Sequence, residues 1–161
     1  MNSLAKKVVE HLAKNGLTLS TAESCTGGLV AATIISVSGS SAVINEAYVT
    51  YSNEAKTKLL GVPEEDIAKN GAVSEIVARK MAYGAKTVSG ADIGVSATGI
   101  AGPGGSTDGK PAGLVYIALC KHKKIVYKRL RLKGGRNTVR RKTTKEILKL
   151  ILKETGYYER I

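Results

Sequence analysis

Strand-like and helix-like segments alternate along this chain of 161 residues, and their order constrains the fold more than any other feature of the sequence. Apolar residues recur at helical spacing in residues 4–12, 29–35, 54–60, 74–89 and 137–151, and a further helix is expected to start at 63–66. Strand-like composition is found in residues 17–22, 46–52, 92–98, 113–121 and 125–132, the last two forming a hairpin. The order α-β-α-β-α-α-β-β-β-α predicts an α/β fold, a three-layer α/β/α sandwich around a mixed sheet.

Several residues mark the expected ends of the helices. Asn15-Gly16 and Gly61 favour left-handed helix ends. Asn53, Ser74 and Asn137 are expected to cap helices with their side chains, and the helix that opens at Ser74 is expected to be the longest.

The chain contains no Phe and no Trp, and its 7 Tyr are its only aromatic residues apart from histidine. Its core must therefore be built from Val, Ile, Leu and Ala, which suits a buried sheet with small-residue helix contacts. The length is typical of one domain, so we expect a single domain over residues 1–161.

Two cysteines, Cys25 and Cys120, match neither the spacing of a zinc site nor a disulfide framework. No apolar run approaches the ~20 residues that a membrane span needs, and residues 1–16 show no targeting signal. We therefore expect a cytoplasmic protein that uses neither a metal nor another cofactor and has no membrane anchor.

The net charge of +12, from 25 Lys and Arg against 13 Asp and Glu, is concentrated late in the chain, where Glu146 is the only acid in residues 121–153. Such a run is typical of a solvated face, but it also suits an anionic ligand or partner. A non-catalytic module associated with nucleotides or nucleic acid is the alternative that it leaves open. Single-strand stacking is not favoured, because Tyr127 is the only aromatic ring in the basic stretch.

The first candidate for a catalytic or binding segment is residues 22–28 (Ala-Glu-Ser-Cys-Thr-Gly-Gly), where a strand is followed by a helix. Ser24, Cys25 and Thr26 all carry nucleophile-capable side chains. Gly27 and Gly28 allow a ligand to approach the backbone, and the helix start offers free N–H groups to an oxyanion or phosphate. Simple capping of the helix by Ser24 and Thr26 explains the same residues equally well.

The second segment is residues 51–56 (Tyr-Ser-Asn-Glu-Ala-Lys), at the end of a strand and the start of a helix. A lysine buried near a helix start has its neutral amine favoured, and a neutral amine can take the proton of a serine hydroxyl. Lys56 fits that role, although an exposed lysine paired with Glu54 is the commoner arrangement.

The third segment is residues 96–105, a strand end followed by Gly-Ile-Ala-Gly-Pro-Gly-Gly. It matches neither the Walker loop nor the dinucleotide fingerprint, and a flexible surface loop is the alternative. Because ligands of open α/β sheets settle beyond carboxyl strand ends, we expect it to face the first two segments.

The fourth segment is residues 133–141, at the start of the last helix. Arg136 and Arg140 lie four residues apart, so they share a helix face. Both planar guanidinium groups can then bind one phosphate.

Taken in order, Ala-Glu-Ser-Cys-Thr-Gly-Gly, Tyr-Ser-Asn-Glu-Ala-Lys, Gly-Ala-Val-Ser-Glu, Ala-Thr-Gly-Ile-Ala-Gly-Pro-Gly-Gly and Lys-Pro-Ala-Gly resemble the CinA C-terminal domain family, the nicotinamide mononucleotide deamidases. The resemblance spans about residues 17–141. It implies hydrolysis of nicotinamide mononucleotide to nicotinate mononucleotide and ammonia in pyridine nucleotide salvage, by a three-layer α/β/α domain that self-associates as a homo-oligomer. Many members also carry a pyrophosphatase-like domain, and we expect this chain to be the stand-alone form.

The resemblance implies a serine activated by a lysine, which maps onto Ser24 and Lys56. We expect backbone N–H groups of the turn 26–28 or of Gly99 to hold the oxyanion. Three further roles follow as hypotheses. Tyr51, as a third catalytic residue, orients Lys56 or stacks on the pyridine ring. Thr98 binds the ribose or amide, and Arg140, with Arg136, binds the phosphate, while residues 25–28 and Gly99 complete the substrate contacts.

Two features depart from the family pattern. An acid often stands between the glycine and the arginine before the last helix, whereas this chain has Gly134-Gly135-Arg136. Cys25 is also a rival nucleophile, but thiol amidases usually rely on a histidine, and neither His11 nor His122 lies in the motif segments. Ser24 is favoured over Cys25 and Thr26. A related carboxamide as substrate stays open.

Overall fold

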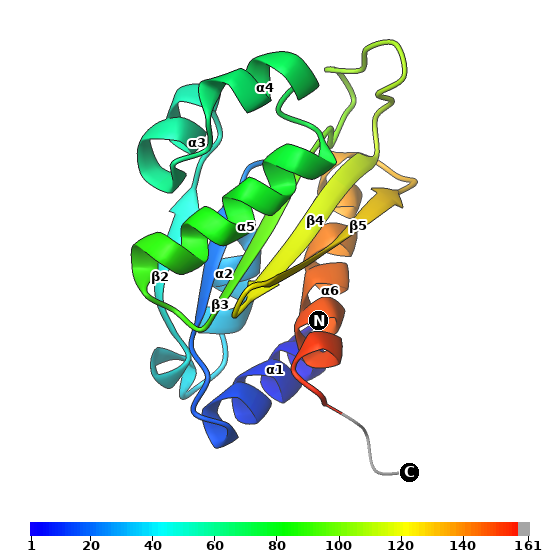
Figure 1. Ribbon diagram of the computed structural model, residues 1–161. Helices are drawn as coiled ribbons and strands as arrows, with labels where there is room; N and C mark the ends of the chain where they lie inside the picture. Colours follow the sequence, from blue (N-terminus) through cyan, green and yellow to red (C-terminus); the bar gives the residue numbers. More distant parts are fainter. Residues whose placement is uncertain (158–161) are drawn as a thin grey trace.

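A five-stranded sheet lies between two layers of helices (Figure 1). The computed structural model describes residues 1–157, so the last four residues of the predicted domain, 158–161, lie outside the described part. The strands are β1 (Leu19–Glu23), β2 (Ile44–Val49), β3 (Ile93–Gly99), β4 (Leu114–Lys121) and β5 (Lys124–Arg131). The helices are α1 (Asn2–Lys14), α2 (Leu29–Ile35), α3 (Asn53–Leu60), α4 (Glu64–Asn70), α5 (Glu75–Ser89) and α6 (Arg136–Glu154), with a short 3-10 helix, η1 (Ser40–Ala42).

The sheet has the strand order β2-β1-β3-β4-β5. The first three strands are parallel, and β4 and β5 are antiparallel to their neighbours, which confirms the predicted mixed sheet. Helices connect the parallel strands, whereas a two-residue turn joins β4 to β5, as short connections permit only between antiparallel strands. The carboxyl ends of β1, β2 and β3 therefore meet at one edge, where α6 also begins.

Two helical layers cover the sheet, and the three-layer α/β/α sandwich is confirmed (Figure 1). Helices α1, α2 and α6 cover one face, and α5 with α3 and α4 covers the other. The core on the first face is aliphatic, as the absence of Phe and Trp requires, and includes Val8, Leu12, Ile34, Leu148 and Ile151. Burial of these side chains on one stripe of each helix holds the layers together.

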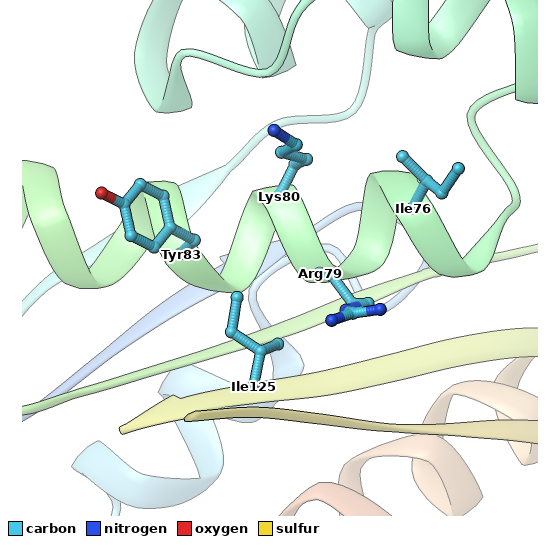
Figure 2. Close-up of a pocket in the computed structure, with 5 residues that line it drawn as sticks. All are labelled: Ile76, Arg79, Lys80, Tyr83 and Ile125. Atoms are coloured by element: carbon cyan, nitrogen blue, oxygen red, sulfur yellow. The ribbon is translucent and has the colours of Figure 1, made fainter. Parts of the chain in front are cut away.

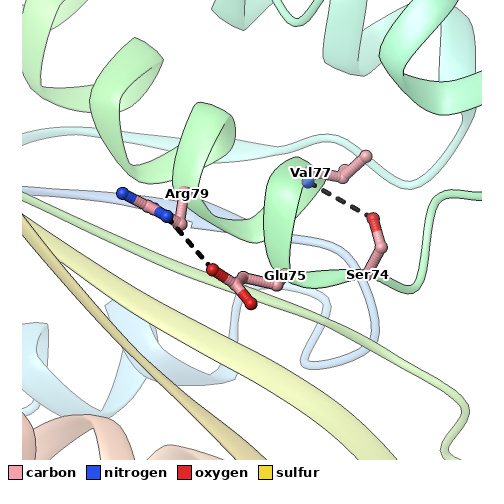
Figure 3. Close-up of polar contacts among 4 residues, drawn as sticks. All are labelled: Ser74, Glu75, Val77 and Arg79. Atoms are coloured by element: carbon pink, nitrogen blue, oxygen red, sulfur yellow. Dashed lines mark hydrogen bonds and ion pairs between the residues drawn. The ribbon is translucent and has the colours of Figure 1, made fainter. Parts of the chain in front are cut away.

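The observed helix ends differ from the predicted ones at two caps, Asn53 and Asn137. Ser74 caps α5 as expected, because its hydroxyl accepts the N–H of Val77 at 3.3 Å, and Glu75 pairs with Arg79 one turn later (Figure 3). Asn53 was the wrong cap for α3, since the hydroxyl of Ser52, one residue earlier, accepts the N–H of Ala55 at 3.0 Å.

Asn137 was also the wrong cap, and α6, with 19 residues, is longer than α5, with 15. Helix α6 starts after Gly135, and the Asn137 side chain lies inside the first turn, where its oxygen accepts a hydrogen bond from Arg140 at 3.1 Å.

The strand predicted at 46–52 starts and ends earlier than expected, at Ile44–Val49. The chain leaves the sheet after Thr50, whose N–H donates to the Glu23 carbonyl at 2.9 Å.

Gly84 in the middle of α5 lets α3 approach closely. A Cβ built at this position would lie 2.9 Å from the carbonyl carbon of Leu60, and real Cβ atoms almost never come so near to backbone. The two helices can therefore hold their separation only with glycine here.

We predict that Gly84→Ala lowers the free energy of unfolding by about 1–3 kcal/mol, because overpacking outweighs the gain of about 1 kcal/mol from alanine in a helix. Urea unfolding monitored by circular dichroism measures this change. Gly104→Ala is the matched control, since a Cβ at Gly104 meets no atom within 4 Å. Equal midpoints for the two variants would contradict close packing at Gly84.

Candidate active site

Segments that are far apart in the sequence converge at the carboxyl edge of the parallel strands. Ser24 follows β1, Tyr51 and Lys56 follow β2, and Gly99 ends β3. Arg136 opens α6 at the same edge and donates hydrogen bonds to Gly102 O at 3.1 Å and to the Tyr51 hydroxyl at 3.0 Å. The predicted convergence of the segments is therefore present in the structure.

Ser24 and Lys56 are in direct contact. The Lys56 Nζ lies 3.3 Å from the Ser24 Oγ, and the two residues are 8% and 1% exposed. Lys56 forms no ion pair with Glu54 within the described residues. The alternative interpretation of the sequence, an exposed Lys56 paired with Glu54, is therefore wrong.

Three backbone carbonyls surround the Lys56 amine. Thr50 O lies at 2.9 Å, and Tyr51 O and Ser52 O lie at 3.3 Å. Burial lowers the pKa of Lys56 below the ordinary value for lysine, because removal from water disfavours the charged form. In this structure the amine is the donor in the contacts with the three carbonyls and with the Ser24 Oγ. Once neutral, it has two N–H groups for two of the carbonyls and one lone pair that can accept the Ser24 hydroxyl proton.

The turn that carries Ser24 exposes backbone donors. Gly27 and Gly28 have φ values of 57° and 89°, which side-chain-bearing residues rarely adopt. The Gly27 N–H donates to Ser24 O at 3.1 Å, whereas the N–H groups of Thr26 and Gly28 have no acceptor in the described residues 1–157. Gly28 is partly exposed, so its N–H is open to a developing oxyanion, whereas Thr26 is fully buried.

The N–H of Gly99 faces the same turn. The Ile100 N–H donates to Leu114 O at 2.9 Å, and the Ser24 N–H donates to Ala97 O at 2.9 Å. The backbone N–H and C=O groups of successive residues point to alternate sides of a strand. Those of residues 97 and 99 therefore point toward β1 and the turn, away from β4. A Cβ at Gly99 would lie 2.7 Å from Leu114 O, so close packing against β4 explains why glycine stands here.

Arg140 holds the turn from the side of α6. Its Nε and Nη2 both donate to Thr26 O, at 3.3 and 2.8 Å. Arg136 and Arg140 thus both reach the site. In this structure they bind backbone carbonyls and the Tyr51 hydroxyl, and each guanidinium retains further N–H donors.

Tyr51 and Thr98 lie at the site in different environments. Tyr51 is 63% exposed, so its ring is open to a ligand, while its carbonyl contacts Lys56. Thr98 is buried, and its hydroxyl donates to Ala72 O at 2.8 Å, which connects the loop before α5 to β3. The predicted roles of both residues in substrate binding stay predictions.

The rival nucleophiles are less suited to attack than Ser24. Cys25 packs in the aliphatic core, and burial raises the pKa of its thiol to about 12. His11 contacts Thr155 at the far end of α6 and His122 lies in the turn at the opposite sheet edge, so neither approaches the thiol. Thr26 is fully buried, with a hydroxyl that has no partner within residues 1–157.

Sequence reasoning missed Glu23 and the three carbonyls of residues 50–52 around the Lys56 amine, which we call the carbonyl cage. The Glu23 carboxylate is buried and accepts the N–H groups of Val30 and Ala31 in the first turn of α2. An acid just before a helix start was the available signal. Carbonyl groups have no sequence signal, because every residue carries one.

A hollow of about 370 Å³ lies elsewhere, between α5 and β5 (Figure 2). Ile76, Arg79, Lys80, Tyr83 and Ile125 line it. None of these residues belongs to the converging segments.

Comparison with known proteins places the chain in a family. The profile of the CinA C-terminal domain matches residues 1–155. The chain belongs to the CinA C-terminal domain family. It is 55% identical over 138 residues to a CinA-like protein of Kosmotoga olearia and 52% identical over 142 residues to one of Dictyoglomus thermophilum, covering 86% and 88% of this chain. It spans about a third, 34%, of the length of each of these two relatives.

Solved CinA structures share the fold over nearly the whole chain. A competence/damage inducible protein of Agrobacterium tumefaciens is 40% identical, with a TM-score of 0.92 over 94% of this chain and 93% of that one. A CinA superfamily protein of Klebsiella pneumoniae is 34% identical, with a TM-score of 0.94 over 98% of both chains.

Residues 1–157 of this CinA domain lack two features. No helix there combines the length and the apolar character of a membrane span. No group of three or more His, Cys, Asp and Glu side chains gathers there in a way that could hold a metal ion.

We predict that Cys25 and Cys120 resist Ellman's reagent in the native protein at pH 8. A pKa of about 12 for Cys25 reduces its thiolate on the order of a thousandfold against a free cysteine, and both residues are buried. The same protein in urea is the control, where both thiols are expected to react at once. Rapid native labelling of Cys25 would restore it as a candidate nucleophile.

Proposed function

We propose that this CinA-family chain is an amidohydrolase that converts nicotinamide mononucleotide to nicotinate mononucleotide and ammonia. The observation that carries the proposal is the contact between a buried amine and a serine hydroxyl at a strand edge lined with free N–H groups. That arrangement suits nucleophilic attack on a carboxamide without further groups.

The reaction proceeds in two stages. Lys56 takes the proton of Ser24, and the Ser24 Oγ attacks the carboxamide carbon, while the N–H groups of Gly99 and of the turn 26–28 stabilise the oxyanion. The C–N bond then breaks, the protonated Lys56 returns its proton to the leaving nitrogen, and ammonia departs. Water next attacks the acyl-enzyme, Lys56 accepts its proton and passes it to the Ser24 oxygen, and the carboxylate product leaves.

Charge and exposure at the rim support a phosphorylated pyridine riboside as substrate. Arg136 and Arg140 supply guanidinium forks for the phosphate, and the exposed ring of Tyr51 offers a stacking surface for the pyridine. Thr98 and the backbone of Gly27 and Gly28 complete the substrate contacts of the proposal.

The setting of the reaction belongs to the same proposal. Cys25 and Cys120 are free thiols, which suits a reducing cytoplasm, where pyridine nucleotides are also found. We propose that the chain acts there on a small-molecule nucleotide as a homo-oligomer. Nucleic acid and cofactors have no part in the proposed reaction.

We predict that wild-type protein releases ammonia from nicotinamide mononucleotide and that Ser24→Ala abolishes turnover. Loss of the attacking oxygen removes the covalent step, whereas substrate affinity, measured by calorimetry, stays within a few-fold. Ser38→Ala is the control, because Ser38 is exposed and lies outside the site. Full turnover by Ser24→Ala would refute the serine mechanism, and no ammonia from wild type would refute the deamidase proposal.

We predict a rate that rises with pH until Lys56 is neutral, with a midpoint below the ordinary pKa of lysine. Burial lowers the pKa of Lys56, and only its neutral form can accept the serine proton, so activity is lost as pH falls through that pKa. Lys56→Arg stays protonated and is expected to be inactive at every pH, whereas the exposed Lys58→Arg keeps the wild-type profile. The kcat/KM profile measures both, and an active Lys56→Arg enzyme would exclude Lys56 as the base.

A further inference from the structure

Glu23 is the one acidic side chain that the described residues 1–157 bury almost completely, at 1% exposure. Its Oε2 accepts the Val30 N–H at 3.0 Å, and its Oε1 accepts the Ala31 N–H at 2.8 Å and the Thr21 hydroxyl at 3.3 Å. The carboxylate thus joins the end of β1 to the first turn of α2. The turn that carries Ser24 lies between these two anchored ends.

The position of Glu23 in the strand determines where Ser24 points. Successive side chains of a strand point to opposite faces. Glu23 points toward α2, and the Ser24 N–H continues the strand ladder by donating to Ala97 O at 2.9 Å. The Ser24 side chain is therefore directed to the opposite face, where Lys56 lies 3.3 Å away.

The backbone of Glu23 also fixes the partner of Ser24. Glu23 O accepts the Thr50 N–H at 2.9 Å, which is the last bond between the ends of β1 and β2. The chain after Thr50 then forms the carbonyl cage of Lys56. Glu23 thereby connects the turn that carries Ser24, helix α2 and the carbonyl cage of Lys56.

We propose that Glu23 is a positioning residue whose buried carboxylate holds the Ser24 hydroxyl against the Lys56 amine. This inference rests on the proposed attack by Ser24. The carboxylate also occupies the amides of Val30 and Ala31, so α2 cannot bind a second anion through them. The developing oxyanion is left to the N–H groups of Gly28 and Gly99, the partly exposed donors of the site.

The test compares Glu23→Gln and Glu23→Asp with Ile34→Ala. A glutamine keeps one oxygen acceptor but turns an NH₂ group toward the other amide, so one of the two bonds is lost. An aspartate keeps the charge and both acceptors on a shorter side chain. Ile34 lies fully buried further along α2, so Ile34→Ala weakens the same helix without altering the carboxylate.

Two readouts separate this inference from the proposed substrate. The first is kcat and KM for ammonia release from nicotinamide mononucleotide. The second is labelling by a fluorophosphonate, measured by intact mass, which requires no particular substrate. In the labelling step the Ser24 oxygen bonds to phosphorus, fluoride leaves, and the serine proton passes to Lys56.

We expect Glu23→Gln to lower kcat and the labelling rate by about 10- to 100-fold with KM little changed, since small misplacements of a nucleophile have effects of this size. Glu23→Asp is expected to recover part of both rates, and Ile34→Ala to keep both while its melting temperature falls. Wild-type labelling without ammonia release would refute the substrate and leave Glu23 supported by the labelling rates alone. Equal rates for Glu23→Gln and Ile34→Ala, or a wild type that does not label, would overturn the positioning role.

Discussion

The burial of the Lys56 amine is the constraint on which the rest of the site depends. An amine removed from water is stable only where polar groups replace its hydration, and the carbonyls of Thr50, Tyr51 and Ser52 do so here. They are free to do so because β2 ends at Val49, so these carbonyls pair with no neighbouring strand. The early end of a strand, rather than any special side chain, thereby supplies the polar groups around the amine, while burial lowers its pKa.

The sheet topology explains why so small a domain can assemble such a site. Strand β1 lies between β2 and β3 and is parallel to both, so the Ser24 turn has a loop on either side. Three interactions then restrain that turn: the Glu23 carboxylate binds α2, Arg140 binds Thr26 O, and the Ser24 N–H extends the ladder to β3. Restraint from three directions is what a nucleophile on a glycine-rich turn requires.

The sequence predicted the architecture well and the local chemistry less well, for physical reasons. Alternating patterns and a short hairpin define the layers, so the sandwich and the meeting of the strand ends could be predicted. The cap at Asn53 was wrong because Ser52 competes for the same role, and only the path of the chain decides between them. The cap at Asn137 was wrong because α6 already starts after Gly135, without a side-chain cap. The sequence allowed both a buried Lys56 and an exposed one paired with Glu54, and it could not decide between them, since burial depends on where β2 stops.

Several basic residues fall into two groups that differ in their hydrogen-bond and ion-pair partners. On β5 and α6, Glu146 pairs with Lys128 and Lys149, and Glu154 pairs with Lys124, which is the pattern of a solvated face. Arg136 and Arg140 differ, because their guanidinium groups bind carbonyls of the loops around Ser24. The charge excess by itself therefore says little about ligands. What distinguishes these two arginines is that an anion bound to them would lie beside Ser24, the nucleophile of the proposed reaction.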